Sequence, residues 1–202
     1  MNNQERWQAY LQPNGVLKNL LNITDQQTLH DTEYVLTIQR QAYSQRHAFV
    51  LPDGARLQGK NVAEVRQIHH YLFADIYDWA GHYRDVNMGK GGTDMFFPFE
   101  RFATAESDIQ EKIDRFQATN AGDIQAVTQA AGELISEINW WHPFREGNGR
   151  TQRVFAQVLA HAKRYTFDIE PDSTAYVEYM QASIDDNPDE MVKVMQRHFR
   201  VV

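Results

Sequence analysis

Residues 142–153 read HPFREGNGRTQR, and this segment carries the most informative chemistry of the chain. Pro143 cannot continue a helix, so a helix that precedes it is expected to end at His142. Gly147 and Gly149 permit positive φ, which lets a tight loop point successive backbone N–H groups inward. A second helix is expected to begin there, and its first N–H groups and positive dipole end favour anions. The segment therefore predicts a helix, an anion-binding loop and a second helix in succession.

The charged side chains of this segment predict a site for a polyphosphate and a metal ion. Arg150 and Arg153 are three residues apart and project from neighbouring faces of the first helical turn, as suits a polyphosphate. Glu146 is the carboxylate beside them, and Mg²⁺ prefers one carboxylate together with phosphate oxygens. His142 is the nearby group that titrates near neutrality, so it is the candidate general base.

Composition sets limits on the kind of protein. The chain has 202 residues, of which 42% are hydrophobic and 23% charged, as in one globular domain spanning residues 1–202. It has no cysteine, which excludes disulfides, thiolate nucleophiles and cysteine-ligated metals. The net charge of −7 disfavours direct binding to nucleic acid or to an anionic membrane. Neither a transmembrane run nor a signal peptide is visible, so we expect a cytoplasmic protein.

Helical spacing of apolar residues dominates the chain and predicts an all-α domain. Thr24 and Gln27 form a predicted capping box that opens a helix through about Gln45. Asn61 and Glu64 repeat this pattern, and the apolar spacing predicts a helix through Trp79 that Gly81 ends. Further helices are expected over about 102–117, from Asp123 to Trp141, over about 150–163, from near Ser173, and from Asn187 with Pro188 at the first helical position.

Residues 83–99 interrupt the helical pattern. Gly89, Gly91 and Gly92 form a glycine-rich centre, and apolar residues such as Met95 and Phe96 flank it. This arrangement predicts a β-hairpin, which would act as a flap. The motif-bearing core of the domain is therefore expected over about 61–164, with flanking helices on both sides.

Segment 142–153 resembles the signature of the Fic (filamentation induced by cAMP) family, His-x-Phe-x-(Asp/Glu)-Gly-Asn-Gly-Arg-x-x-Arg, at every position. The resemblance extends to Trp79-Ala80-Gly81, to Arg84 and to the Lys-Gly-Gly-Thr run at 90–93. It implies a Fic-type helical bundle with a β-hairpin flap. It also implies transfer of AMP from ATP, with Mg²⁺, to a Ser, Thr or Tyr hydroxyl of a target protein.

The same resemblance implies a role for individual residues. His142 matches the family's catalytic base and Glu146 its Mg²⁺ ligand, while Phe144 matches a structural residue. Gly147, Asn148 and Gly149 match the anion nest, Arg153 the γ-phosphate clamp, and Arg150 a residue that holds the nest or the β-phosphate. The remaining implied residues lie in the flap, with Lys90 and Gly91 at the nucleotide and Gly92, Thr93, Met95 and Phe96 docking the target.

More than one function is compatible with the sequence. The related Doc protein is a kinase that has lysine where this chain has Gly149, so AMP transfer is favoured here. Transfer of UMP or phosphocholine, and a catalytically silent binding module, also stay open. His69 and His70 are adjacent on a helix and cannot share one metal, so one packed and one surface histidine are expected. Trp140 and Trp141 are expected in the core.

Regulation is predicted from a motif search. Many Fic proteins carry an inhibitory helix with the pattern Ser/Thr-x-x-x-Glu-Gly/Asn. Ser107 to Glu111 has this spacing but Lys112 follows, and Thr166 to Glu170 is followed by Pro171. The pattern is absent, which implies a separate small antitoxin that supplies the inhibitory glutamate. A type II topoisomerase is the implied target, and a host protein is the alternative if the chain belongs to a secreted effector.

Overall fold

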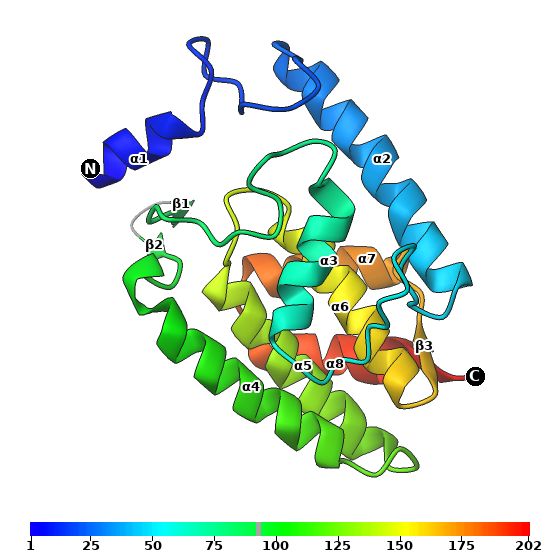
Figure 1. Cartoon of the computed structure of the whole chain (residues 1–202). Helices are drawn as coiled ribbons and strands as arrows, with labels where there is room; N and C mark the ends of the chain where they lie inside the picture. Colours follow the sequence, from blue (N-terminus) through cyan, green and yellow to red (C-terminus); the bar gives the residue numbers. More distant parts are fainter. Residues whose placement is uncertain (92–93) are drawn as a thin grey trace.

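The computed structural model describes residues 1–91 and 94–202, and helices dominate it (Figure 1). The expected all-α fold with a small β-hairpin is confirmed. In chain order the elements are α1 (Asn3–Ala9), α2 (Gln26–Arg46), α3 (Ala63–Phe73), β1 (Gly89–Gly91), β2 (Asp94–Met95), a 3₁₀ turn (Phe99–Arg101), α4 (Phe102–Ala118), α5 (Ile124–Trp141), α6 (Asn148–Ala162), β3 (Tyr165–Phe167), α7 (Thr174–Ile184), α8 (Pro188–His198) and β4 (Phe199–Val201).

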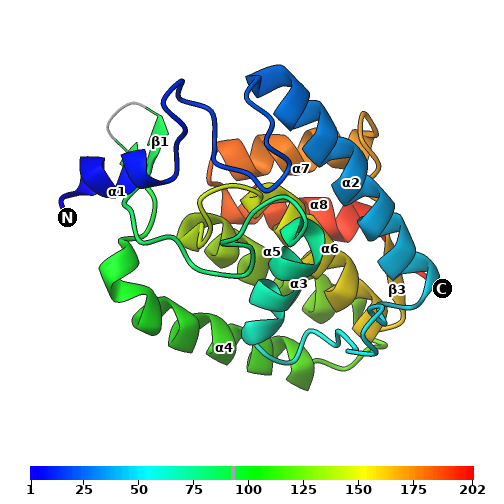
Figure 2. The ribbon, with the colours of Figure 1, turned by 45° about the horizontal axis from the view of Figure 1, so that its top comes forward.

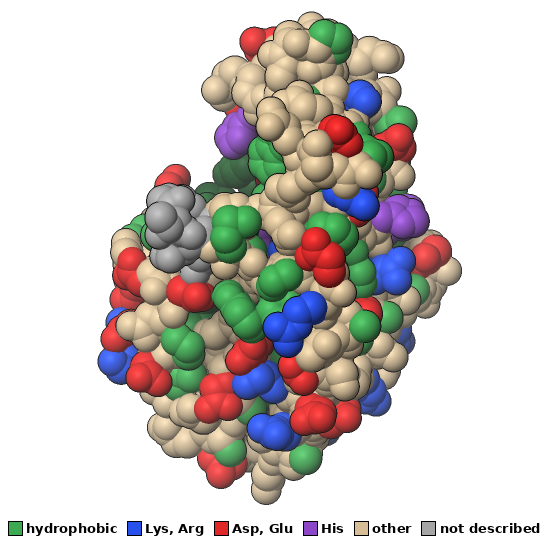
Figure 3. All heavy atoms as spheres, turned by 90° about the vertical axis from the view of Figure 1, so that its left-hand side faces the viewer, with side chains coloured by type: hydrophobic (Ala, Val, Ile, Leu, Met, Phe, Trp, Pro, Cys, Tyr) green, Lys and Arg blue, Asp and Glu red, His purple; other side chains and the backbone are tan. Residues whose placement is uncertain are grey.

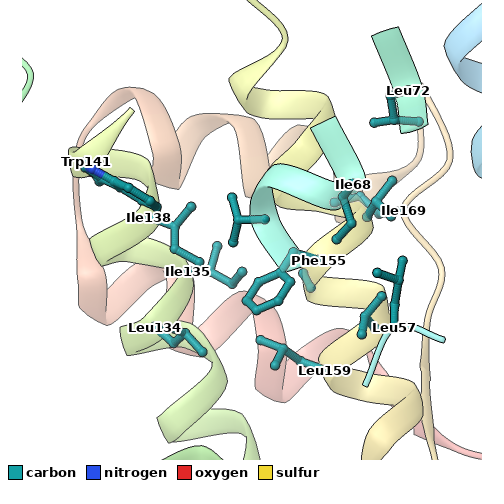
Figure 4. Close-up of a cluster of buried hydrophobic side chains, with 14 of the residues drawn as sticks. Leu57, Ile68, Leu72, Leu134, Ile135, Ile138, Trp141, Phe155, Leu159 and Ile169 are labelled. Carbon is teal, nitrogen blue, oxygen red and sulfur yellow. The ribbon is translucent and has the colours of Figure 1, made fainter. Parts of the chain in front are cut away.

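Helix α5 lies at the centre of the packing and contacts α4, α6 and α8. On the other side of α6 lies α3, and α2 packs against α3 (Figures 1 and 2). Asp123 caps α5 as expected, because its carboxylate accepts a hydrogen bond from the Ala126 N–H at 3.0 Å. The core that α5 shares with α3 and α6 includes Ile135, Phe155 and Leu72 (Figure 4). This core fixes both helices that flank the motif loop.

Helices α5 and α8 approach closely at Gly132. A Cβ atom at this position would lie 2.5 Å from the Cα atom of Val192, which is backbone and cannot turn aside. We therefore expect Gly132→Ala to lower the free energy of unfolding by about 3 kcal/mol, as overpacking does. Denaturant unfolding measures this, with Gly122→Ala as the matched control in an open turn. An equal effect of the two substitutions would contradict the close approach.

The starts of α2 and α3 and the end of α3 differ from the sequence-based expectation. Val62, which makes no side-chain capping hydrogen bond, stands at the N-cap of α3 in place of the expected Asn61. Asp25, rather than Thr24, caps α2, and its carboxylate accepts from the Thr28 N–H at 2.8 Å. Helix α3 ends at Phe73 and does not continue through Trp79, because the Arg40 guanidinium takes the carbonyls of Tyr71 and Leu72. These long-range hydrogen bonds terminate the helix, and apolar spacing alone cannot reveal them.

Two further features were not predicted. The N-terminal residues form the short helix α1, and β3 pairs with β4 as an antiparallel sheet in which Tyr165 faces Val201. Trp141 is buried as expected, but the expectation for Trp140 is wrong, because 42% of it is exposed. His69 is buried and His70 exposed, as predicted. No helix among the described residues is long and apolar enough to cross a bilayer.

Candidate active site

The motif loop begins where α5 ends at His142. This residue takes a left-handed conformation, with φ of 46°, and its N–H donates to the Ile138 carbonyl. The imidazole stacks on the Phe96 ring of the hairpin, with ring centroids 3.7 Å apart and planes 11° from parallel. The candidate base therefore lies directly beneath the predicted flap.

Arg84 connects the end of α5 to both stems of the hairpin. Its guanidinium donates to the carbonyls of His142 at 2.8 Å, Val86 at 2.6 Å and Phe97 at 2.6 Å. The side chain is buried, and burial lowers the pKa of Arg84 to about 10. A charge that donates to carbonyls on three segments fixes His142 relative to the hairpin.

Asn148 closes the loop from inside. Its Nδ2 donates to the Phe144 carbonyl at 2.7 Å, and its Oδ1 accepts from the Phe144 N–H at 2.9 Å. Gly147 precedes it with φ of 82°, and a Cβ there would lie 2.4 Å from the Phe73 ring. Both polar atoms of the Asn148 side chain thus bind the backbone of the loop itself. Asn148 therefore shapes the anion nest by fixing the conformation of the loop backbone.

His69 supports the loop from α3. Its Nε2 donates to the Glu146 carbonyl at 3.0 Å, while its Nδ1 accepts from the Gly81 N–H at 2.8 Å. Its ring stacks on Phe144 at 3.8 Å. Burial lowers the pKa of His69 to about 3, so the ring stays neutral in the single tautomer that these partners require. His69 thus holds the backbone of Glu146 without carrying charge.

Helix α1 contacts the loop from the opposite side. The buried Arg145 guanidinium lies 3.7 Å from the centroid of the Trp7 ring, and burial lowers the pKa of Arg145. Arg6 and Tyr10 both bind the Asp85 carboxylate at the base of the hairpin, at 2.8 and 2.9 Å. Helix α1 therefore joins the motif loop to the flap, a role that the sequence did not reveal.

The two arginines of the motif differ in their partners. Arg150 lies between the carboxylates of Glu33 and Glu146, at 2.5 and 3.3 Å. Arg153 is largely buried beside Tyr176, with its Nη1 3.6 Å from the Met180 sulfur, and burial lowers its pKa. Arg153 forms no ion pair with an acidic side chain within residues 1–91 and 94–202.

Two cavities bear on the location of the site. A small one, of about 80 Å³, is lined by Arg150, Arg153, side chains of α2, Tyr176 of α7 and residues 169–171, which include Glu170. A larger one, of about 810 Å³, lies between α2 and α3, and no residue of segment 142–153 lines it. The small cavity matches the predicted phosphate site, because the side chains of Arg150 and Arg153 both line it.

The hairpin carries the remaining predicted site residues. Strands β1 and β2 pair antiparallel, with Gly89 opposite Met95 and Gly91 opposite Asp94. Met95 is exposed, and Phe96 lies on His142. The predicted docking residues Gly92 and Thr93 lie outside the described residues. The face that carries α1 and the hairpin mixes both signs of charge, with no continuous patch of one sign (Figure 3).

The structure thus brings His142, Glu146, the Gly147–Gly149 loop and both motif arginines into one region. Sequence reasoning missed Glu33, Trp7 and Arg145 as partners of this region. A clue for Glu33 was the presence of three arginines and one carboxylate in segment 142–153, which leaves positive charge to be balanced. The sequence offers many acidic residues, so it could not indicate which one.

The chain matches the model of the Fic/DOC family over residues 60–160. It is 34% identical to "Probable protein adenylyltransferase y4lH" of Sinorhizobium fredii, over 76% of this chain and 74% of that protein. It is 33% identical to protein adenylyltransferase VbhT of Bartonella schoenbuchensis, over 91% of this chain but only 37% of VbhT.

Solved structures show the same fold. The BepC effector of Bartonella tribocorum, solved with bound AMPPNP, superposes with a TM-score of 0.80 at 21% identity, covering 96% of this chain and 98% of that one. The Fic domain of a Bartonella quintana effector, solved with bound ADP, gives 0.77 at 24% identity, covering 96% and 95%. The match of the family model and the identity to these relatives confirm the resemblance seen in segment 142–153: the chain belongs to the Fic/DOC family.

Proposed function

We propose that the chain is a protein adenylyltransferase, which moves AMP from ATP to a side-chain hydroxyl of a target protein and releases pyrophosphate. One observation carries the proposal: a single loop, closed by Asn148, joins His142 at the end of α5 to the N-terminus of α6. The candidate base and the anion-binding amides are therefore held in one rigid unit. The names of the relatives, which are protein adenylyltransferases, support the same reaction.

The chemistry follows from the roles of these groups. His142 accepts the proton of the target hydroxyl, whose oxygen attacks the α-phosphorus of ATP. The bond between this phosphorus and the bridging oxygen breaks, and pyrophosphate leaves with the electron pair. The N-terminus of α6 and the cationic Arg153 stabilise the phosphate charge that develops. Positioning and electrostatics are what this kind of transfer requires from a protein.

The residues present fit a magnesium ion. Glu146 offers a side chain that is 42% exposed, in the loop just before α6. No group of three or more acidic, histidine or cysteine side chains in the described part of the chain could hold a metal by itself. The substrate phosphates would supply the other oxygens, which is the arrangement that Mg²⁺ prefers. When bound, the ion would neutralise phosphate charge as a Lewis acid.

We assign target docking to the hairpin. An extended segment of the target would pair with the hairpin backbone, as in strand addition, and this would bring a hydroxyl to His142. The exposed side chain of Met95 and the ring of Phe96 are placed to contact such a segment. Lys90 and Gly91, in strand β1, remain the proposed hairpin contacts to the nucleotide.

Labelled ATP tests the reaction type. The purified chain is incubated with Mg²⁺, a bacterial lysate and ATP labelled on either the α- or the γ-phosphate. Label from the α-position on a protein band is expected. Label only from the γ-position would indicate a kinase instead, and no label from ATP would favour transfer of another group or a silent module.

We further propose that a separate small protein inhibits this chain in the cytoplasm. The support is that Arg153, which lines the 80 Å³ cavity together with Tyr176 and Glu170, forms no ion pair with Glu170 or with any other acidic side chain among the described residues. A glutamate supplied by another protein could pair with it there and displace the γ-phosphate. A type II topoisomerase is the first target to test, and a host protein is the alternative, as for a secreted effector.

Expression of the chain alone is therefore expected to slow bacterial growth. The physical reason is that an Arg153 without an acidic partner leaves ATP able to bind with its α-phosphorus aligned for attack. Growth curves measure this, and cells that express the His142→Ala variant at the same level serve as the control. Equal growth of the two strains, with no transfer by the pure protein, would mean that the inhibition resides within the chain.

A further inference from the structure

Arg150 is shared unequally between two carboxylates. Its Nη2 lies 2.5 Å from Oε2 of Glu33 but 3.3 Å from Oε1 of Glu146. The same guanidinium lies over the Phe73 ring, 4.7 Å from its centroid. Glu33 is also the more buried partner, with 5% of its side chain exposed against 42% for Glu146. The guanidinium of Arg150 is therefore paired mainly with Glu33 of α2.

Glu33 is fixed in turn by a second buried group. The Tyr77 hydroxyl donates to Oε1 of Glu33, which leaves Oε2 for Arg150. Burial and the neighbouring Glu33 carboxylate raise the pKa of Tyr77, so the phenol remains a proton donor. Glu33 lies outside the residues 60–160 that the family model matches. A helix outside that region therefore supplies the main counter-charge of a motif arginine.

This arrangement affects what Glu146 can bind. Its Oε1 already accepts from the Gly147 N–H at 2.8 Å and, more distantly, from Arg150. Arginine and carboxylate side chains prefer a close, bidentate contact with two parallel hydrogen bonds. Without Glu33, Glu146 would be the remaining acidic partner of Arg150 among the described residues, and such a contact would occupy the carboxylate. A cation would then have to displace the guanidinium before it could bind.

We propose that Glu33 is a positioning residue that restrains Arg150, so that the Glu146 carboxylate stays available to a divalent cation. The inference rests on the proposed function, because it takes Glu146 as the metal ligand. It assigns a purpose to a buried acidic residue of α2. It also predicts that the cost of losing Glu33 appears in metal binding and depends on Arg150.

Direct metal binding tests the proposal. Mn²⁺ is titrated into the purified chain with a non-hydrolysable ATP analogue, and unbound Mn²⁺ is followed by electron paramagnetic resonance. Glu33→Gln is expected to weaken Mn²⁺ binding by about tenfold, the scale of one charge-assisted contact. Asp31→Asn removes a charge from an exposed position of the same helix and is the matched control, which should bind as the wild type does.

The dependence on Arg150 separates positioning from a general loss of structure. In an Arg150→Ala background, Glu33→Gln is expected to cause no further weakening, because the competing guanidinium is gone. Equal weakening in both backgrounds would overturn the proposal, as would unchanged Mn²⁺ binding by a folded Glu33→Gln variant. If that variant does not fold, Glu33→Asp replaces it, since it keeps the charge but withdraws the carboxylate, and it should also weaken binding.

Glu146→Gln distinguishes failure of the inference from failure of the metal site. This variant is expected to lose the tight Mn²⁺ site. If it still binds Mn²⁺ as the wild type does, then Glu146 is not the metal ligand, and the proposed role of Glu33 is refuted as well. Transfer of AMP to protein is measured in a separate assay, and its outcome tests the reaction type independently of the role of Glu33.

Discussion

Replacement of His142 by alanine is expected to reduce AMP transfer by about 10²–10⁴-fold, the range typical for loss of a general base. ATP should still bind, because the imidazole acts on the incoming hydroxyl and lies at the end of α5 rather than on α6, where the phosphates are expected. Transfer from labelled ATP and equilibrium binding of a nucleotide analogue measure the two effects separately.

The matched control for this variant is His30→Ala. His30 lies exposed on α2, so its loss should leave transfer unchanged. A His142→Ala protein that retains most of its activity would remove the base assignment. Loss of nucleotide binding in this variant would instead assign His142 to the nucleotide site.

Replacement of Glu146 by glutamine is expected to reduce transfer by about 10²-fold or more and to abolish its response to Mg²⁺. A neutral amide is a weaker ligand for a hard cation than a carboxylate, although it is almost the same size. The measurement is initial rate against Mg²⁺ concentration. Removal of the metal from the wild type with a chelator should give a similar loss.

Glu133→Gln serves as the control, because Glu133 is exposed on α5 and pairs with Gln129 on the same helix. Its rates should follow the wild-type curve at every Mg²⁺ concentration. Wild-type activity of Glu146→Gln at limiting Mg²⁺ would show that Glu146 is not the metal ligand.

The parts of the fold that the sequence predicted correctly depend on local signals. Asp123, Ser173 and Asn187 each cap a helix by accepting a hydrogen bond from the N–H three residues later, and the sequence predicted a helix that starts at or near each of them. The helix before Pro143 and the helix after Gly147 were also predicted. Proline restricts the backbone dihedral angles at position 143, and glycine widens the range of these angles at position 147. These effects operate over a few residues and remain visible without the fold.

The parts that were missed depend on contacts between distant segments. Helix α3 ends at Phe73 because Arg40, more than thirty residues earlier, binds its last carbonyls. The sheet of β3 and β4 forms between residues 165–167 and 199–201, and neither strand has a partner close by in sequence. Short elements of this kind gain their stability from pairing and packing, which a single sequence does not record.

The candidate site shows the same division. The motif residues 142–153 were assigned from their order alone, because one loop and one helix turn contain them. Glu33 was not assigned to the site, because it is separated from Arg150 by 117 positions in the sequence and approaches it only in the fold. Its burial follows from the packing of α2 on α3, and its charge is balanced only in the folded chain.

The central claim is that this chain attaches AMP to a hydroxyl of another protein by means of His142. Mass spectrometry of a target modified by the purified chain with ATP and Mg²⁺ tests it most directly. The account predicts adenosine monophosphate, linked through its phosphate to a Ser, Thr or Tyr side chain, and no such adduct with the His142→Ala variant. A phosphate alone, a different transferred group, or an equal amount of adduct from the variant would contradict it.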